Sequence, residues 1–187
     1  MQYKMLVLDM DDTLLTDDHT ISEENKVMLA KAKDLGVYVV LASGRPTPAM
    51  TAYAKELQLD DSYMISYNGA VITDLSNDEV IFEQTLTQEQ IHALYDYSLE
   101  HKTHIITYVN NQIVSETDSQ YIDIEKNITG LAHNKVADFK AEVQSSAIKC
   151  ILLEDPEYLK KVETHLKEAM PHLSVCMSKP FFLEVAQ

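Results

Sequence analysis

The chain has 187 residues, of which 45% are hydrophobic and 24% are charged, enough to bury one good core or a core with a smaller companion. Its 15 Lys and Arg against 30 Asp and Glu give a formal net charge of -15, so nucleic acids and anionic membranes should repel it. Every apolar run is shorter than the roughly 20 residues of a membrane span, and the first is too short for a signal peptide. We therefore predict a cytoplasmic protein that binds neither nucleic acid nor membrane.

The first 69 residues predict strands that alternate with helices. Ser22 is a typical N-cap residue, and Gly36 is a typical helix stop. Pro46 suits the first turn of a second helix. Strands are expected at 4–8, 37–42 and 63–67, with helices at 23–35 and 46–58 between them. This alternation predicts a parallel sheet with right-handed crossovers.

The pattern changes after residue 69. The runs 69–74 and 79–84 flank the turn-like segment 75–78, which predicts a hairpin. Further strands are expected at 104–109, 112–116, 147–154, 173–178 and 181–186, and helices at 88–102, 118–129 and 156–170. This part is typical of an α+β unit with an antiparallel sheet.

Polar groups follow each of the first three predicted strands. Asp9 and Asp11 follow the first, Ser43-Gly44-Arg45 the second and Asn68-Gly69 the third. Ligands of open parallel sheets bind outside the carboxyl ends of the strands. Turn chemistry explains exposed loop acids, and we assign that role to Asp12, Asp17 and Asp18. Turn chemistry alone does not explain polar groups at three successive strand ends, so we predict a site there.

Three segments together carry a family resemblance. "MLVLDMDDT" resembles the first motif of the haloacid dehalogenase superfamily, and Asp9, Asp11 and Thr13 match it position by position. "VVLASGRP" resembles the second motif, with Ser43 in the hydroxyl position. "ISYNGAVI" resembles the Asn-Gly segment of the Cof-type branch, which inserts a cap after the third strand. Any one of these segments would be weak alone, but their combination at these separations is specific.

The resemblance implies a fold and a domain plan. The fold class would be α/β, with a Rossmann-like parallel sheet core and an inserted α+β cap domain that contains an antiparallel sheet. Residues 1–83 would form the first part of the core, and residues 84–180 would form the cap. Residues 181–187 would be a strand that returns to the core.

The resemblance also implies the chemistry of the two acids. Asp9 would be the nucleophile, which forms an aspartyl-phosphate, and would give one oxygen to Mg²⁺. Asp11 would be the general acid and then the general base, with its main-chain carbonyl on the metal. A carboxylate that attacks a phosphate ester meets charge repulsion, and Mg²⁺ reduces that repulsion. Thr13 would support the loop.

Four residues at the next two strand ends are candidates for binding the substrate phosphate. By the same resemblance, Ser43 would donate a hydrogen bond to a phosphoryl oxygen, and Gly44 would allow close approach of the backbone. Arg45 and Asn68 would contribute from the second layer or toward the cap. A surface salt bridge for Arg45 and a turn position for Asn68 remain the alternatives.

Two motifs of the complete family pattern are missing from the 187 residues. In the Cof-type branch, a Lys and a "GDxxND"-like acidic segment follow the strand that "KPFFLEV" resembles. Lys179 lies before that strand, and Lys149 lies within the cap-like part. Neither residue therefore matches the Lys of the family pattern. We therefore expect a truncated core with an unpaired sheet edge and an uncovered face. We also expect little or no phosphatase activity from these residues alone.

Three functional alternatives remain open. The first is an Mg²⁺-dependent phosphatase acting on a small phosphorylated metabolite, such as a sugar phosphate. The second is a relative of the phosphosugar mutases, which shares the chemistry of the first motif. The third is a non-catalytic fragment that folds or works only with a complementing chain or as a homo-oligomer. A receiver-type phosphoacceptor domain is disfavoured, because Ser43 and Asn68 stand at the strand ends where an acceptor Asp would be needed.

Overall fold

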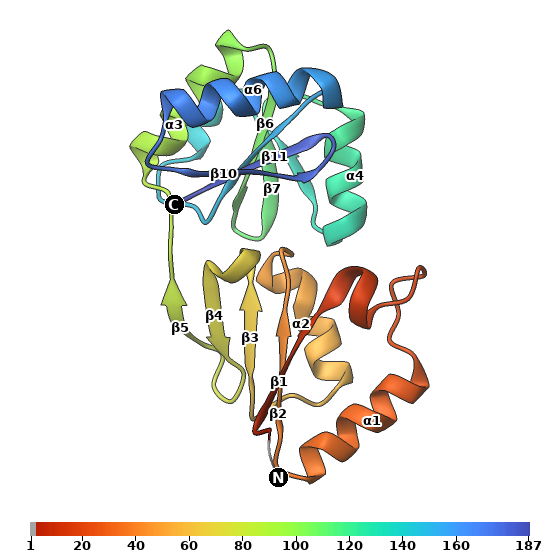
Figure 1. The fold of residues 1–187 in the computed structure, drawn as a ribbon. Helices are drawn as coiled ribbons and strands as arrows, with labels where there is room; N and C mark the ends of the chain where they lie inside the picture. The colour runs from red at the N-terminus through yellow and green to blue at the C-terminus, as the bar shows by residue number, and fades with distance from the viewer. Residues whose placement is uncertain (1–2) are drawn as a thin grey trace. The chain divides into compact units, whose positions relative to one another are not determined.

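The computed structural model describes residues 3–187, which belong to two compact units, Met1–Glu83 (unit 1) and Gln84–Gln187 (unit 2). The division follows Glu83, where the sequence analysis also places a boundary. The chain is a mixed α/β protein with a separate sheet in each unit (Figure 1). Among the described residues, no helix is both long and apolar enough to cross a membrane.

Unit 1 is built on a five-stranded sheet in the order β1-β2-β3-β4-β5. The strands are β1 (Met5–Asp9), β2 (Tyr38–Ala42), β3 (Tyr63–Ser66), β4 (Val71–Asp74) and β5 (Glu79–Glu83). β1 pairs with β2 in parallel and β2 pairs with β3 in parallel, whereas β4 and β5 complete the sheet as an antiparallel hairpin. The predicted parallel core and hairpin are both confirmed.

Two helices cover one face of this sheet. They are α1 (Glu23–Asp34) and α2 (Thr47–Glu56), and two short turns, η1 (Met10–Leu14) and η2 (Tyr67–Gly69), follow β1 and β3. α1 begins where predicted, since the Ser22 hydroxyl accepts a hydrogen bond from the Asn25 amide at 3.2 Å. Leu29 of α1 and Met50 of α2 join one buried cluster with Leu41 of β2, so the helices share a face.

β1 is an open edge of the sheet in the part of the chain that the structure describes. It pairs only with β2. Met5, Val7 and Tyr38 lie on the face opposite the helices, and each is 50% exposed. The unpaired edge and uncovered apolar face expected from the sequence are therefore present.

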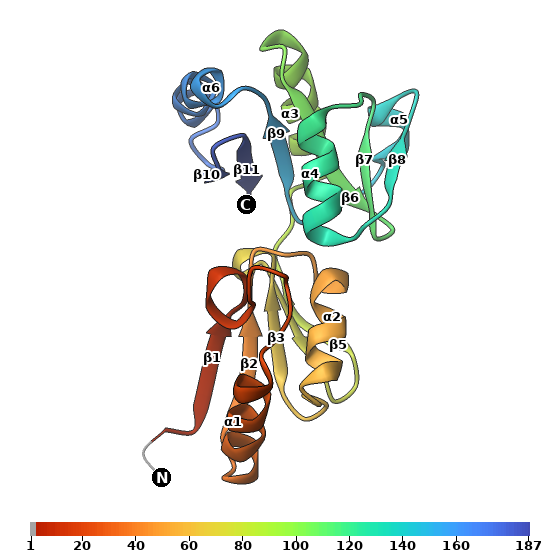
Figure 2. The same ribbon diagram turned by 90° about the vertical axis from the view of Figure 1, so that its right-hand side faces the viewer.

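Unit 2 contains a six-stranded sheet in the order β10-β11-β9-β6-β7-β8. Its strands are β6 (His104–Val109), β7 (Gln112–Ser115), β8 (His133–Lys135), β9 (Cys150–Leu153), β10 (Ser174–Lys179) and β11 (Phe182–Ala186). Its helices are α3 (Gln88–Glu100), α4 (Gln120–Thr129), α5 (Phe139–Glu142) and α6 (Pro156–Ala169). The two views in Figures 1 and 2 show these helices around the sheet.

The predicted antiparallel sheet of unit 2 contains one parallel pair. β7 and β8 run parallel, because α4 lies between them in sequence and carries the chain back to the same end of the sheet. The sequence analysis missed β8 because "HNK" has no apolar alternation, and it missed α5 because a helix of 4 residues leaves no periodic pattern.

The prediction that 181–187 returns to the core is wrong. β11 pairs antiparallel with β10 and with β9 inside unit 2. Leu183 and Val185 are fully buried in the core of unit 2. The physical reason is local: β10 and β11 form a hairpin around Pro180, and alternate apolar residues of β11 complete the face that α3 and α6 cover.

The other face of the unit 2 sheet holds buried polar groups. Glu184 lies between Leu183 and Val185, so its side chain points to the face opposite the main core. Lys149 Nζ lies 3.0 Å from Glu184 Oε2. Tyr108 donates a hydrogen bond to Glu125 Oε1 of α4 at 2.5 Å. Burial raises the pKa of Glu125 above its ordinary value, so α4 and the sheet enclose a charge cluster.

Candidate active site

Asp9 is the last residue of β1, and the turn that follows presents it outward. Met10 and Leu14 of η1 are buried and anchor the turn. Asp12 has φ 58°, which reverses the chain within η1. The Thr13 hydroxyl donates a hydrogen bond to Asp9 Oδ2 at 3.0 Å. The predicted nucleophile is exposed, and the hydrogen bond from Thr13 favours one orientation of its carboxylate.

The Asp11 carboxylate is hydrogen-bonded to Arg45 and remains partly exposed. Arg45 Nε donates to Asp11 Oδ2 at 2.9 Å and Arg45 Nη2 donates to Asp11 Oδ1 at 2.6 Å. Arg45 is only 7% exposed, and its hydrogen bond to Asp11 is the main cause that raises the Arg45 pKa. A bidentate guanidinium favours an ionised carboxylate, so this arrangement stabilises the charged form of Asp11 over the neutral form.

The loops after β2 and β3 are joined by backbone hydrogen bonds. The Asn68 amide donates to the Ser43 carbonyl at 3.0 Å, and the Tyr67 amide donates to the Arg45 carbonyl at 3.0 Å. A Cβ on Gly44 would lie 2.7 Å from Asn68 Oδ1, so the side chain of Asn68 occupies the space that glycine leaves. The close approach predicted for Gly44 is thus to Asn68 of this chain.

Ser43 is buried against the same loop. Its hydroxyl oxygen accepts a hydrogen bond from the Arg45 amide at 3.1 Å, which leaves the hydroxyl proton able to donate. The Ser43 amide donates to the Ile65 carbonyl at 3.0 Å. Parallel pairing of β1, β2 and β3 therefore brings all three predicted strand ends to one edge of the sheet.

The sequence analysis missed two residues near Asp11. His19 Nδ1 lies 4.0 Å from Asp11 Oδ1 and 3.5 Å from Arg45 Nη2. The Arg45 guanidinium carbon lies 5.6 Å from the centre of the Tyr53 ring. From its sequence position, Tyr53 is expected to be a packing residue of α2. His19 lies in a loop that has no periodic pattern, so no sequence signal links either residue to Asp11.

The donors at this edge fit a hard cation. Mg²⁺ prefers oxygen ligands and is usually held by one or two carboxylates together with water and substrate phosphate. The Asp9 carboxylate and the Asp11 main-chain carbonyl are oxygen donors of this kind. Within residues 3–187, no three His, Cys, Asp or Glu side chains gather into a metal-binding group.

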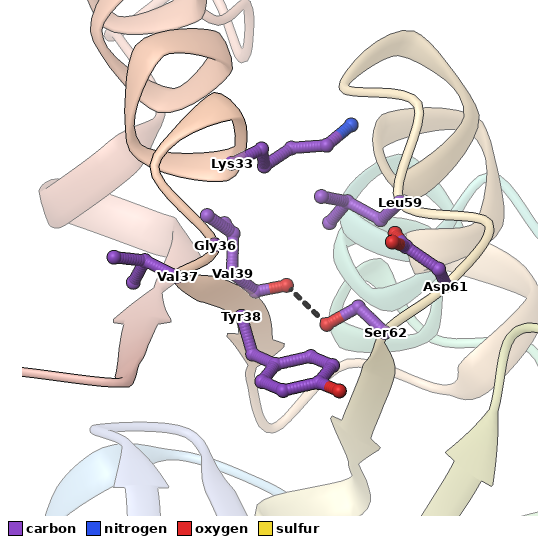
Figure 3. Close-up of a pocket in the computed structure, with 8 residues that line it drawn as sticks. All are labelled: Lys33, Gly36, Val37, Tyr38, Val39, Leu59, Asp61 and Ser62. Atoms are coloured by element: carbon purple, nitrogen blue, oxygen red, sulfur yellow. Dashed lines mark hydrogen bonds between the residues drawn. The ribbon is translucent and has the colours of Figure 1, made fainter.

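A separate cavity lies at the other end of the strands. It has a volume of about 170 Å³ and is lined by Lys33, Gly36, Val37, Tyr38, Val39, Leu59, Asp61 and Ser62 (Figure 3). Ser62 donates a hydrogen bond to the Val39 carbonyl at 2.6 Å. Lys33 donates to the Leu57 carbonyl at 2.9 Å, at the end of α2. These residues precede or open β2 and β3, so the cavity is not part of the Asp9 site.

Comparisons with known proteins identify the family to which the chain belongs. Residues 6–187 match the family described as haloacid dehalogenase-like hydrolase. The chain is 33% identical over 190 residues to a Bacillus subtilis protein named "Putative phosphatase YxeH", a match that covers 98% of this chain and 70% of that protein. The family match spans nearly the whole sequence.

Two solved structures share the fold. A haloacid dehalogenase-like hydrolase from Bacteroides thetaiotaomicron has a TM-score of 0.92 and 31% identity, and the match covers 99% of this chain and 71% of that one. The HAD subclass IIB sugar phosphatase BT4131 has a TM-score of 0.80 over 98% of this chain and 69% of that one. Its identity of 21% shows the fold alone. The chain belongs to the haloacid dehalogenase-like hydrolases of the Cof type.

Proposed function

We propose that the protein hydrolyses phosphate monoesters of a small metabolite, such as a sugar phosphate, through an aspartyl-phosphate on Asp9. The observation that carries this proposal is the exposed Asp9 carboxylate at the end of β1, oriented by Thr13 and two residues from Asp11. The structural neighbour BT4131 is named as a sugar phosphatase, and sugar phosphates are therefore the substrate class to test first. Unit 2 serves as the cap in this proposal, and the cytoplasm remains the predicted location.

The first half-reaction uses both acids. An oxygen of Asp9 attacks the phosphorus, the bond from phosphorus to the ester oxygen breaks, and the leaving oxygen takes a proton from Asp11. Asp11 must first gain that proton, and this requires its two hydrogen bonds from Arg45 to loosen. Mg²⁺ held by the Asp9 carboxylate and the Asp11 main-chain carbonyl would offset negative charge at the phosphate.

The second half-reaction restores the enzyme. Asp11 accepts a proton from a water that attacks the phosphorus, and the bond from phosphorus to Asp9 breaks to release phosphate. The Ser43 hydroxyl donates a hydrogen bond to a phosphoryl oxygen in both steps and keeps its proton. Asn68 contributes by supporting the Ser43 and Gly44 backbone, which its amide and side chain contact.

We expect the purified 187-residue chain to hydrolyse p-nitrophenyl phosphate weakly or not at all with Mg²⁺. The reason is that the Lys and later acidic motif of the family pattern are not among its residues. The measurement is p-nitrophenol release with and without Mg²⁺. Robust Mg²⁺-dependent release that Asp9→Asn abolishes would contradict this expectation, and it would at the same time support the proposed reaction.

A second candidate is a chain that works only together with another polypeptide. The open β1 edge and the exposed Met5, Val7 and Tyr38 favour it, because such edges readily accept a further strand. Light scattering separates the possibilities. A monomer with a cooperative melt argues against obligate pairing, whereas a dimer that Val7→Lys disrupts shows that copies of the chain pair at this edge.

A further inference from the structure

The loop between η1 and α1 is folded tightly beside Asp11. Leu15 and Ile21 form an antiparallel bridge that closes it. Inside it, the Thr16 amide donates to the Thr20 carbonyl at 2.9 Å, and the Thr16 hydroxyl contacts the Thr20 hydroxyl at 2.9 Å. His19 has φ 56°, a left-handed conformation that is uncommon for a residue with a side chain. The loop therefore holds a conformation that needs support.

Tyr53 gives this loop its support from α2. Its hydroxyl donates a hydrogen bond to the His19 carbonyl at 3.0 Å, across 34 positions of sequence. The bond ends on the residue with the unusual φ. Its ring packs partly buried against the core of unit 1, so the donor is fixed while the loop it holds is exposed.

The same ring also lies beside Arg45. The guanidinium carbon is 5.6 Å from the ring centre, within the range of a cation–π contact. Arg45 in turn donates two hydrogen bonds to Asp11. The His19 ring lies near both of these residues, 4.0 Å from Asp11 Oδ1 and 3.5 Å from Arg45 Nη2. Tyr53 thus contacts both Arg45 and the loop of His19 from α2.

We propose that Tyr53 is a positioning residue, which fixes the Asp11 carboxylate through Arg45 and through the loop of residues 16–20. A tyrosine that served only to fill the core would need neither the bond to the His19 carbonyl nor a charged guanidinium at its face. The role in turnover rests on the proposed function. The effect on Arg45 and on the loop does not.

The test compares two substitutions that separate the ring from the hydroxyl. Tyr53→Phe keeps the ring, so the Arg45 Nε–H should stay protected while amide exchange in residues 16–20 accelerates about two- to tenfold. Tyr53→Leu removes the aromatic ring as well as the hydroxyl. Because the contact between the ring and the guanidinium is then lost, the exchange rate of the Arg45 Nε–H should also rise, by about two- to fivefold. NMR of ¹⁵N-labelled full chain measures both rates, and Tyr53→Met replaces Tyr53→Leu if that variant does not fold.

The matched control is Tyr38→Leu, since Tyr38 is a half-exposed tyrosine on the opposite face of the unit 1 sheet. It should change neither rate. Unchanged exchange at both Arg45 and residues 16–20 in Tyr53→Leu or Tyr53→Met would overturn the proposal. Where turnover is measurable, kcat should fall with KM nearly constant. The exchange rates are measured without substrate, so they test the position of Tyr53 whether or not the 187-residue chain hydrolyses phosphate esters.

Discussion

Asp9→Asn is expected to weaken divalent-cation binding at the end of β1 by at least about tenfold, or about 1.4 kcal/mol, and to remove any hydrolysis. The substitution keeps the shape and removes the charge. An amide oxygen is a poorer ligand for a hard cation than a carboxylate, and an amide does not attack phosphorus. Mn²⁺ in place of Mg²⁺ makes binding measurable without turnover, through paramagnetic broadening of the amide signals of residues 9–13 and 43–45.

The control for Asp9→Asn is Asp18→Asn, which removes the same charge from an exposed loop position. It should leave the Mn²⁺ affinity of the β1 site within about twofold, because exposed charges in water interact weakly. Equal loss of affinity in the two variants would mean that Mn²⁺ responds to the overall net charge. In that case Asp9 would not be a ligand.

Lys149→Met is expected to destabilise unit 2 by about 3–5 kcal/mol. The Lys149 side chain is 4% exposed and that of Glu184 is 11% exposed, with 3.0 Å between Nζ and Oε2. Removal of the ammonium leaves the Glu184 carboxylate enclosed near Glu125, whose own pKa burial already raises. Urea denaturation followed by amide exchange in β9 and β11 measures the free energy of unfolding of unit 2.

The double variant Lys149→Met/Glu184→Met should recover most of that loss, because a buried ion pair and an apolar pair of similar volume are often close in stability. Lys167→Met is the exposed control. Lys167 lies 2.8 Å from Glu163 on α6, with half of its side chain exposed, so its removal should cost under about 1 kcal/mol. A double variant as unstable as Lys149→Met would show that the lysine acts through other contacts.

Local sequence signals account for most of the fold. The cap at Ser22 and the apolar runs of β1, β2 and β9 can each be recognised within a few residues, because helix ends and buried strands depend on nearby side chains. β8 and α5 are not predicted, because they are too short to show a periodic pattern of apolar residues. β11 was placed in the wrong unit, since an apolar strand does not reveal which neighbour it pairs with.

In the candidate site, too, contacts between residues close in sequence could be predicted, whereas contacts between distant residues could not. Asp9 and Thr13 are four residues apart and hydrogen-bonded, so a motif shows them together. Arg45 and Asp11 are 34 positions apart, and only the parallel pairing of β1 with β2 brings them into contact. His19 and Tyr53 come into contact because α2 packs beside the loop of His19. A sequence pattern does not contain this packing.

The placement of β11 has a consequence for how the chain behaves under stress. In the described residues the backbone passes from one unit to the other a single time, between Glu83 and Gln84, and each unit has its own buried cluster. Heat or denaturant can thus melt one unit while the other keeps its structure. A single unfolding midpoint would then average the unfolding of the two units, and cleavage between Glu83 and Gln84 would separate them.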